Sequence, residues 1–459
     1  MKFDIQHLGL INHVIIDTKS LTIICGQNNT GKTYLTHSLY GVLAFLRKAK
    51  RYAINDNQKE LLRNKGVCEI DLLEVASAYY RLLNPEERNK LAKEIPGLLG
   101  KGSLSSTPIL NLEVSKDIIE DIQRRILDFR FDFPVQLHDE YKLHFSKDRG
   151  SSMVSCRYVP DVKMRQNIYV GVSLAVPDTV FADVDWVIYF LISQKVPRPF
   201  IIGSERTGVS VFRDEFALFR SIAFDDTKIS DKLIELRKRF SFDSYPIAVR
   251  KDIEFSARFP LLVSTQDTDV YAKVKGLFED IASGHFEVDG DTGKLYFIPN
   301  SSNDSLTLNE SSSSVRALCE LFFYVKYCAR QGDILIVDEP ELNLHPSSQR
   351  KIARLLIRLV NAGIRVLVTT HSEYIVREIN AITRLNGLNE ECKVDLLKRH
   401  GISLLDLINR AQVNCYVLKD GSADMMTPDS QYGFAVSSFD DAIRKLNALY
   451  DDLDDAECE

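Results

Sequence analysis

The chain begins with strand-like and then helix-like hydrophobic patterns. Residues 2–8 and 11–17 alternate apolar and polar side chains, which predicts two half-buried strands. Residues 21–25 are nearly all β-favouring and lead into Gly26, as expected for a buried strand that enters a turn. An apolar stripe with helical spacing follows, made of Leu35, Leu39, Val42, Leu43 and Leu46. The pattern therefore predicts three strands and a helix.

A second ordered region begins near residue 285. Residues 334–337 and 364–368 are short apolar runs, suited to strands that are covered on both faces. Between them lies a helical stripe made of Ile352, Leu355, Leu356, Leu359 and Val360. Gly363 follows this stripe and is suited to a left-handed C-cap. A strand, a helix and a strand at this spacing predict a right-handed parallel crossover.

The middle of the chain, residues 52–284, has a different pattern of charged and apolar residues. Charged helical segments alternate with strand-like runs; the helical segments are 87–93, 113–128 and 230–239, and the strand-like runs are 167–172 and 186–192. No period repeats and no heptad pattern persists, which argues against the long coiled-coil arm of chromosome-organising ATPases. We predict one α/β domain formed by residues 1–51 and 285–459, with residues 52–284 as an inserted helical or mixed subdomain.

Composition adds only broad limits. Apolar residues make up 45% of the 459 positions and charged residues 27%, as in a globular protein with a sizeable core. The net charge of −6 argues against a broadly basic surface but allows a local basic patch. The eight cysteines form no C-x-x-C pair and are expected to be reduced thiols. Without a signal-peptide pattern or an apolar stretch of about 18 residues, we expect a cytoplasmic protein with no membrane partner.

The strongest chemical signal lies between the third strand and the first helix, and it matches G-x-x-x-x-G-K-[ST]. Its residues are Gly26, Gln27, Asn28, Asn29, Thr30, Gly31, Lys32 and Thr33. In such a loop the backbone amides and the helix N-terminus bind phosphates. Lys32 would contact the β- and γ-phosphates and the Thr33 hydroxyl would bind Mg²⁺. A simple glycine turn is the alternative, but the flanking strand and helix favour ATP binding.

Acidic and histidine side chains follow the two buried strands. Asp338 and Glu339 come directly after residues 334–337, and His371 follows the next strand. Because parallel strands end at the same edge, these side chains are expected at one ligand-binding crevice. Asp338 would then bind Mg²⁺ through its water shell, Glu339 would polarise the attacking water, and His371 would contact the γ-phosphate. The alternatives are surface carboxylates and a structural histidine.

Three further segments allow more than one interpretation. The serine run 311–314 precedes an expected helix at 315–325, either as a simple N-cap or as a phosphate contact through Ser312, Ser313 and Ser314. Residues 199–206 predict a strand that ends in Glu205 and Arg206, which form either a surface ion pair or a sensor near the nucleotide. The basic cluster 47–51 either stabilises a helix C-terminus or contacts DNA.

In this order the motifs resemble the ATP-binding-cassette (ABC) class of P-loop ATPases, in particular its SMC, RecF and OLD-like branch within the AAA family. The resemblance assigns residues 26–33 to Walker A, 334–339 to Walker B, 341–346 to the D-loop and His371 to the switch histidine. Residues 311–314 occupy the signature position, where the family usually reads L-S-G-G-Q. The resemblance implies a mixed sheet with flanking helices, plus a large, mostly helical insertion.

The amino-acid sequence of residues 338–346 and 369–372 is similar to that of ATPase subunits of anti-phage defence systems such as Septu and PARIS. This similarity implies a homodimer or higher homo-oligomer that sandwiches ATP, with the serine run acting in trans. It also implies an ATPase that acts as a nucleotide-dependent sensor or scaffold and controls a separate effector, an HNH or TOPRIM nuclease. The trigger would be DNA or a phage protein.

No nuclease motif is evident in the chain itself. Asp420 and Gly421 predict a hairpin turn rather than a metal site, and no H-N-H cluster is apparent among the nine histidines. A RecF-like DNA-repair ATPase that clamps DNA is the main alternative. A transporter subunit is disfavoured by the serine-only signature and by the large insertion.

Overall fold

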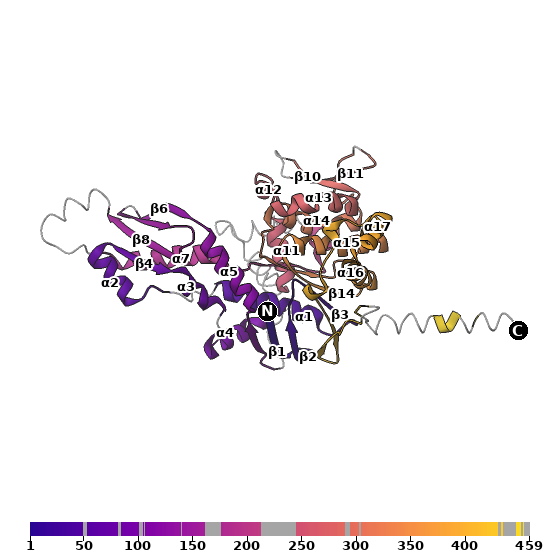
Figure 1. The fold of residues 1–459 in the computed structure, drawn as a ribbon, viewed down its shortest axis with the longest axis horizontal. Helices are drawn as coiled ribbons and strands as arrows, with labels where there is room; N and C mark the ends of the chain where they lie inside the picture. The colour runs from indigo at the N-terminus through magenta and orange to yellow at the C-terminus, as the bar shows by residue number, and fades with distance from the viewer. Residues whose placement is uncertain are drawn as a thin grey trace, which may run out of the picture. The chain divides into compact units, whose positions relative to one another are not determined.

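The computed structural model describes residues 1–48, 53–80, 84–100, 104, 106–138, 140–160, 176–212, 245–289, 294–302, 304–429, 433–434, 447–450 and 453. The predicted strand at 167–172, the predicted helix at 230–239, residues 49–51 of the basic cluster, Cys458 and most of the acidic tail lie outside these residues. The described part forms two compact units (Figure 1). The first contains Met1, residues 43–83 and residues 112–198; the second contains residues 2–42, 84–111 and 199–459.

The first unit contains a four-stranded antiparallel sheet of order β4-β8-β7-β6. Its elements are α2 (Asp56–Lys65), β4 (Val67–Asp71), α3 (Leu72–Tyr80), α5 (Lys116–Asp128), β6 (Phe131–His138), β7 (Tyr141–Lys147), β8 (Met153–Pro160) and α7 (Asp178–Ser193). Alternating burial along β7 and β8 gives the sheet one buried face. The segment expected to be mostly helical therefore also contains a sheet.

The second unit is built on a nine-stranded mixed sheet of order β5-β1-β2-β16-β15-β3-β14-β13-β9. Its strands are β1 (Lys2–Leu8), β2 (Ile11–Asp17), β3 (Leu21–Gly26), β9 (Pro199–Ile202), β13 (Ile334–Asp338), β14 (Arg365–Thr370), β15 (Val413–Lys419) and β16 (Ser422–Met425), joined by β5 (Ile109–Glu113), which crosses the boundary between the units. Strands β15, β3, β14, β13 and β9 run parallel. Their carboxyl ends therefore share one edge.

Helices and a small three-stranded sheet complete this unit. They are α4 (Pro85–Leu98), α8 (Arg206–Val211), α11 (Ile247–Ser256), α12 (Phe259–Leu262), α13 (Asp269–Ala282), β10 (Gly284–Val288), β11 (Leu295–Pro299), β12 (Leu306–Thr307), α14 (Ser313–Phe323), the π-helical turn η2 (Tyr324–Cys328), α15 (Pro346–Asn361), α16 (Glu373–Asn386), α17 (Glu390–His400) and the 3₁₀ turns η3 (Leu404–Asp406) and η4 (Arg410–Gln412). Helix α1 (Lys32–Lys48) crosses the boundary between the units.

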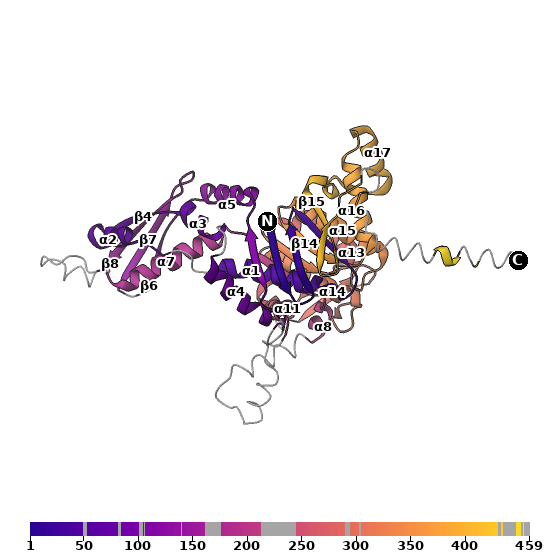
Figure 2. The same cartoon turned by 90° about the horizontal axis from the view of Figure 1, so that it is seen from below.

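The core of the second unit follows from the apolar stripes in the sequence. Ile352, Leu355, Leu356 and Leu359 of α15 are all fully buried, and α15 packs against β3, β14, α13 and α16 (Figure 2). Strand β13 is buried along its whole length, as expected for a parallel strand that is covered on both faces. Gly363 adopts φ +89° directly after α15, as expected.

Other predicted elements are also confirmed. Strands β1, β2 and β3 and helix α1 match the N-terminal pattern, β13 and β14 are parallel, and Asp420 and Gly421 form a hairpin turn between β15 and β16 with positive φ at both residues. The seven described cysteines are free thiols. In the segment 113–128, the helix begins only at Lys116 because Glu113 belongs to β5.

Elements β9, α8, α11, α12 and α13 belong to the second unit with the large sheet, although the sequence assigned residues 199–284 to the insertion. The physical reason is that β9 hydrogen-bonds to β13 as the edge strand. The predicted domain boundaries, after residues 51 and 284, concern which segments fold independently, and they stay a prediction. Within the described residues, no helix combines the length and apolar character needed to cross a bilayer.

The prediction of a strand at 186–192 was wrong, because this segment lies in helix α7. Val184, Val187, Ile188 and Leu191 are buried at helical spacing, whereas Trp186 and Phe190 are exposed. The run is rich in β-branched and aromatic residues, which favour strands. Burial of one helical face outweighs that local preference.

We therefore expect Ile188→Ala to destabilise the first unit by about 2–5 kcal/mol, because its side chain is fully buried. Phe190→Ala should cost less than about 1.5 kcal/mol, because that ring is 48% exposed and mainly stacks on Trp186. Urea unfolding followed by the fluorescence of Trp186, the only tryptophan, measures both. In a strand these two residues would share one face, so equal costs would contradict the helix.

Candidate functional site

The loop between β3 and α1 leaves backbone amides available. Among the hydrogen bonds of the described residues, none has a backbone N–H of residues 28–31 as its donor. Gly31 adopts φ +95°, and a Cβ atom there would lie 3.1 Å from Ile11 Cγ1, so the turn requires glycine. Available amides next to a helix N-terminus form a concavity suited to anions.

Lys32 lies within this loop and is almost completely buried. Its Nζ donates to the carbonyl oxygen of Gly26 at 3.0 Å and to that of Gln27 at 2.8 Å. Burial lowers the pKa of Lys32. The Thr30 hydroxyl also donates to the Gln27 carbonyl, at 2.9 Å, which closes the loop around the ammonium group. Thr33, by contrast, is exposed, so its hydroxyl is accessible.

Strand pairing brings distant segments to this loop. Cys25 at the end of β3 pairs with Thr370 of β14, and Thr369 pairs with Asp338 of β13. A side-chain hydrogen bond also joins α1 to β13. The Thr36 hydroxyl donates to Asp338 Oδ1 at 2.9 Å, across 302 sequence positions. The sheet therefore places Lys32, Asp338, Glu339 and His371 at neighbouring strand ends.

Asp338 is held by two hydroxyl groups. Besides Thr36, the Thr369 hydroxyl donates to Asp338 Oδ1 at 3.0 Å. Burial raises the pKa of Asp338 to about 7. His37 Nε2 lies 3.6 Å from Asp338 Oδ2, too far for a good hydrogen bond. Burial lowers the pKa of His37 to about 4, so its imidazole is neutral at physiological pH.

Glu339 adopts a left-handed backbone with φ +49°, which costs about 1–3 kcal/mol for a non-glycine residue. Its N–H donates to the Thr369 carbonyl at 3.1 Å. His371 Nε2 lies 3.3 Å from Glu339 Oε1, and this contact holds the pKa of the Glu339 carboxyl below its usual value. A partly exposed carboxylate beside an imidazole is suited to orienting a water molecule.

Glu341 lies deeper and fixes the end of β14. Its Oε1 accepts hydrogen bonds from the His371 N–H at 2.6 Å and from the Thr370 hydroxyl at 2.9 Å. Burial raises the pKa of Glu341. The carboxyl therefore holds His371 in place from the backbone side.

Arg206 is not part of a surface ion pair, because it is 3% exposed and lies behind Asp338 and Glu339. Its guanidinium group donates to both of their carbonyl oxygens, at 2.9 and 2.8 Å. It also donates to the carbonyl oxygens of Gly203 at 2.8 Å and Ala317 at 3.0 Å. The sequence could not distinguish this position from an ion pair, since the acceptors come from three separate segments.

Two buried carboxyls accompany Arg206. Asp252 accepts a hydrogen bond from the Gly203 N–H at 3.1 Å and lies against Glu320. Burial raises the pKa of Asp252 to about 7 and raises that of Glu320 as well. Both carboxyl groups lie close to the buried guanidinium group.

The serine run caps α14 through the Ser312 hydroxyl. Ser312 Oγ accepts from the Val315 N–H at 3.3 Å and lies 2.8 Å from Ser314 Oγ. Ser312 and Ser313 are exposed. No hydrogen bond among the described residues joins Ser312–Ser314 to residues 26–33. The N-cap interpretation is therefore confirmed, and the phosphate contact stays a prediction.

Sequence reasoning missed the polar residues that support the site. Thr36, Thr369, Asp252 and Glu320 were not singled out, although each is buried. Thr36 carried the clearest signal, because it lies one helical turn after Lys32 on the inner side of α1. The others became recognisable only when the contacts between separate elements were known.

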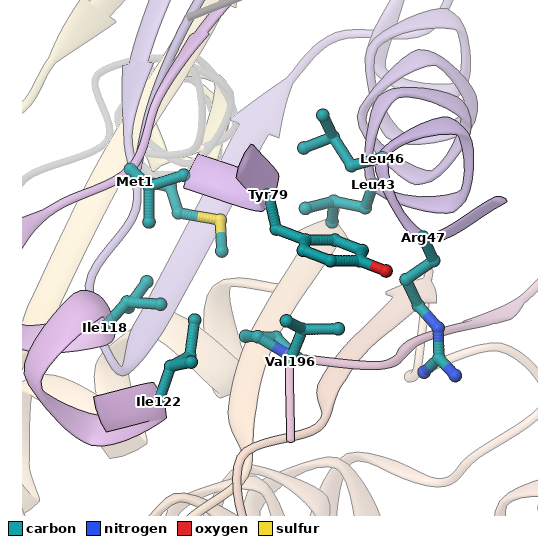
Figure 3. Close-up of a pocket in the computed structure, with 10 residues that line it drawn as sticks. Met1, Leu43, Leu46, Arg47, Tyr79, Ile118, Ile122 and Val196 are labelled. Carbon is teal, nitrogen blue, oxygen red and sulfur yellow. The ribbon is translucent and has the colours of Figure 1, made fainter. Parts of the chain in front are cut away.

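A small pocket in the first unit has no comparable chemistry (Figure 3). Its lining is mainly apolar, with Arg47 at the edge, and consists of Met1, Leu43, Leu46, Arg47, Tyr79, Val114, Ile118, Ile122, Val196 and Pro197. Since converging polar groups mark most ligand sites, we place the candidate site at the strand ends of the second unit instead.

A family comparison agrees with this geometry. Residues 225–376, about a third of the chain, match the AAA ATPase domain. The match includes Asp338, Glu339 and His371. This part of the chain is similar to an ATPase domain. With the order of the mixed sheet and its flanking helices, the match shows a P-loop fold of the ABC-ATPase type. No curated protein matches the sequence.

Three solved SMC heads are similar to this chain at low sequence identity. The Smc head bound to the C-winged helix domain of ScpA is 11% identical, covers 93% of this chain and 96% of its own, and has a TM-score of 0.37. A Smc head with an extended coiled coil, bound to a ScpA domain from Pyrococcus furiosus, is 10% identical, covers 98% of this chain and 98% of its own, and has a TM-score of 0.32. The SMC head from Thermotoga maritima is 10% identical, covers 93% of this chain and 98% of its own, and has a TM-score of 0.28. At these TM-scores they carry no functional argument.

The raised pKa of Asp252 predicts a pH dependence of stability. Between about pH 4 and pH 7 the folded state binds a proton that the unfolded state has released, so this carboxyl contributes less stability as the pH rises. Asp252→Asn removes the titration. Relative to wild type, the variant should therefore gain stability between about pH 5 and about pH 7.5, measured by urea unfolding. The exposed Asp395→Asn provides the control. An Asp252→Asn difference that is the same at both pH values would contradict this assignment.

Proposed function

We propose that this chain binds ATP with Mg²⁺ at residues 26–33 and hydrolyses it to ADP and phosphate. The observation that supports this proposal best is the convergence of Lys32, Asp338, Glu339 and His371 at the carboxyl ends of β3, β13 and β14. Ligands of open α/β sheets bind at this kind of edge. A cation and a water-orienting carboxylate beside a phosphate-binding loop are groups that phosphoryl transfer to water uses.

The loop and Lys32 would bind the triphosphate. In this proposal the backbone amides of residues 28–31 donate to phosphate oxygens, and Lys32 exchanges its two carbonyl partners for the β- and γ-phosphates. Thr33 and Asp338 would hold Mg²⁺. The accessible Thr33 hydroxyl and the Asp338 carboxylate are oxygen donors of the kind that Mg²⁺ prefers. When bound, the ion neutralises charge on the phosphates.

Glu339 would orient the attacking water and accept its proton. Its lowered pKa keeps it ionised at neutral pH, ready for this role. His371 would keep Glu339 in position and contact the γ-phosphate. Glu341 supports His371 through the backbone N–H.

The active form would be a homodimer or a higher homo-oligomer. Ser312, Ser313 and Ser314 lie at the start of α14 and make no hydrogen bond to their own phosphate loop among the described residues. In the proposed assembly they contact ATP that is bound by a second copy. Binding between subunits would then depend on nucleotide, which makes the assembly a switch.

The cellular role that we propose is anti-phage defence. Residues 338–346 and 369–372 are similar in sequence to ATPase subunits of such systems, and the chain itself has no evident nuclease motif. The ATPase would act as a sensor and scaffold for a separate effector, an HNH or TOPRIM nuclease. DNA or a phage protein would provide the trigger.

Two variants test the chemistry. Lys32→Ala should abolish ATP binding, because the loop loses its only cation. Glu339→Gln should retain ATP binding while kcat falls on the order of 100-fold or more, because the amide cannot accept a proton. Dimers should accumulate in Glu339→Gln with ATP, as measured by sedimentation. Lys351→Ala and Glu390→Gln, both on the surface, are the matched controls. Hydrolysis at the wild-type rate in Glu339→Gln would contradict the assigned role.

Phage plating tests the defence role. Cells that carry the chain and its neighbouring gene should resist phage, whereas Lys32→Ala and Glu339→Gln should abolish resistance and Lys351→Ala should not. Co-purification with the neighbouring gene product, with and without ATP, identifies the effector. Unchanged resistance in both site variants would refute the mechanism. Hydrolysis that DNA stimulates, in a chain that binds no neighbouring gene product and confers no phage resistance, would instead favour the RecF-like clamp.

A further inference from the structure

Arg206 joins three separate segments through backbone carbonyls. It follows β9 and donates to Gly203 in its own turn, to Ala317 in α14 and to Asp338 and Glu339 at the end of β13. Every acceptor is a main-chain oxygen. The side chain therefore fixes the positions of these backbone segments relative to one another and forms no direct ion pair among these contacts.

Only arginine can make this set of contacts. Its guanidinium group has five N–H donors in a planar fork, whereas lysine has three donors on a single nitrogen. Asp252 of α11 and Glu320 of α14 lie near this guanidinium group, which is removed from water. Since buried carbonyls need donors, loss of Arg206 would leave several of them unsatisfied.

The contact with Glu339 matters most. This residue has a left-handed backbone, and such a conformation persists only where the surroundings hold it. Thr369 accepts the N–H of Glu339 on one side, and Arg206 donates to its carbonyl oxygen on the other. The Leu342 N–H shares this carbonyl oxygen at 3.1 Å, so Arg206 is the side chain among the groups that hold the Glu339 backbone, while His371 contacts the carboxyl itself.

The contact with α14 links this conformation to the serine run. Ala317 lies one turn after Ser313 in the same helix, so a movement of the helix start displaces the carbonyl that Arg206 holds. Ser210 of α8 adds to the link, because its hydroxyl donates to the Arg206 carbonyl oxygen at 2.9 Å and also lies 3.4 Å from the Arg316 carbonyl oxygen of α14.

We propose that Arg206 is a positioning residue that couples the position of α14 to the conformation of Glu339. The inference rests on the proposed function, in which the serines of α14 contact ATP bound by a second copy. ATP in the neighbouring site then sets Glu339 of this subunit for hydrolysis in its own site. The two sites of the dimer therefore hydrolyse ATP together, and hydrolysis is cooperative.

Arg206→Lys tests this coupling. We expect kcat to fall about 10–100-fold, because the position of Glu339 is no longer fixed, while the Kd for a non-hydrolysable ATP analogue changes less than about threefold. The Hill coefficient for ATP in hydrolysis should fall to about 1. Arg358→Lys is the control, since the Arg358 side chain is 15% exposed and pairs with the buried carboxylate of Asp406 rather than with backbone carbonyls of the site. Equal behaviour of the two variants would overturn the proposal.

Ser210→Ala is the second, milder variant. It removes a hydroxyl between α8 and α14 without touching Glu339, so it keeps the test open if Arg206→Lys fails to fold. We expect a lower Hill coefficient with a smaller loss of kcat than in Arg206→Lys. An unchanged Hill coefficient in Ser210→Ala would also count against the coupling.

The double variant Arg206→Lys with Ser313→Trp separates coupling from simple damage. If the serine run acts on Glu339 through Arg206, blocking it should cost little in the Arg206→Lys background but much in wild type. Multiplicative losses would overturn the inference. The proposed function fails separately, if Lys32→Ala still binds and hydrolyses ATP.

Discussion

The site depends on the parallel pairing of β3 with β14 and of β14 with β13. This pairing brings together segments of the chain that are about 300 positions apart and ends their strands at one edge. Each strand is buried, so register is set by the burial of apolar side chains on both faces. A shift by one residue would turn Asp338 away from Thr36 and Thr369. The hydrophobic core therefore controls where the polar groups lie.

The polar groups at this edge carry an energetic cost. Lys32, Asp338, Glu341, Arg206, Asp252 and Glu320 are all buried. Removing charges from water is unfavourable unless each finds a partner, and most of these groups shift their pKa accordingly. The left-handed backbone of Glu339 adds strain. Such concentrations of buried charge and strain are typical of functional sites, where stability is lost in favour of a prearranged geometry.

Sequence patterns were sufficient wherever a signal was local. The apolar runs at 21–25 and 334–337, the helical stripe of α15 and the Asp420–Gly421 turn each depend on near neighbours, and the structure confirms them. The phosphate loop was likewise visible from its spacing. The assignment of roles to its residues, and to Asp338, Glu339 and His371, stays a prediction until nucleotide is bound.

Long-range features could not be read from the sequence. The strand expected at 186–192 was wrong because local propensity favoured β structure, whereas burial of Val187 and Ile188 requires a helix. For Arg206 the sequence left open a surface ion pair and a sensor near the nucleotide, because nothing nearby in sequence reveals that Ala317 and Glu339 accept its hydrogen bonds. The serine run remained ambiguous because the ligand that we propose for it would be bound by a second copy of the chain.

A structure of Glu339→Gln with ATP and Mg²⁺ tests the account most directly. The account predicts that the triphosphate lies along residues 26–33 with Lys32 at the terminal phosphate, and that Ser312, Ser313 and Ser314 of a second copy close over it. Nucleotide bound elsewhere, or a bound nucleotide whose terminal phosphate faces solvent with no second copy, would contradict it.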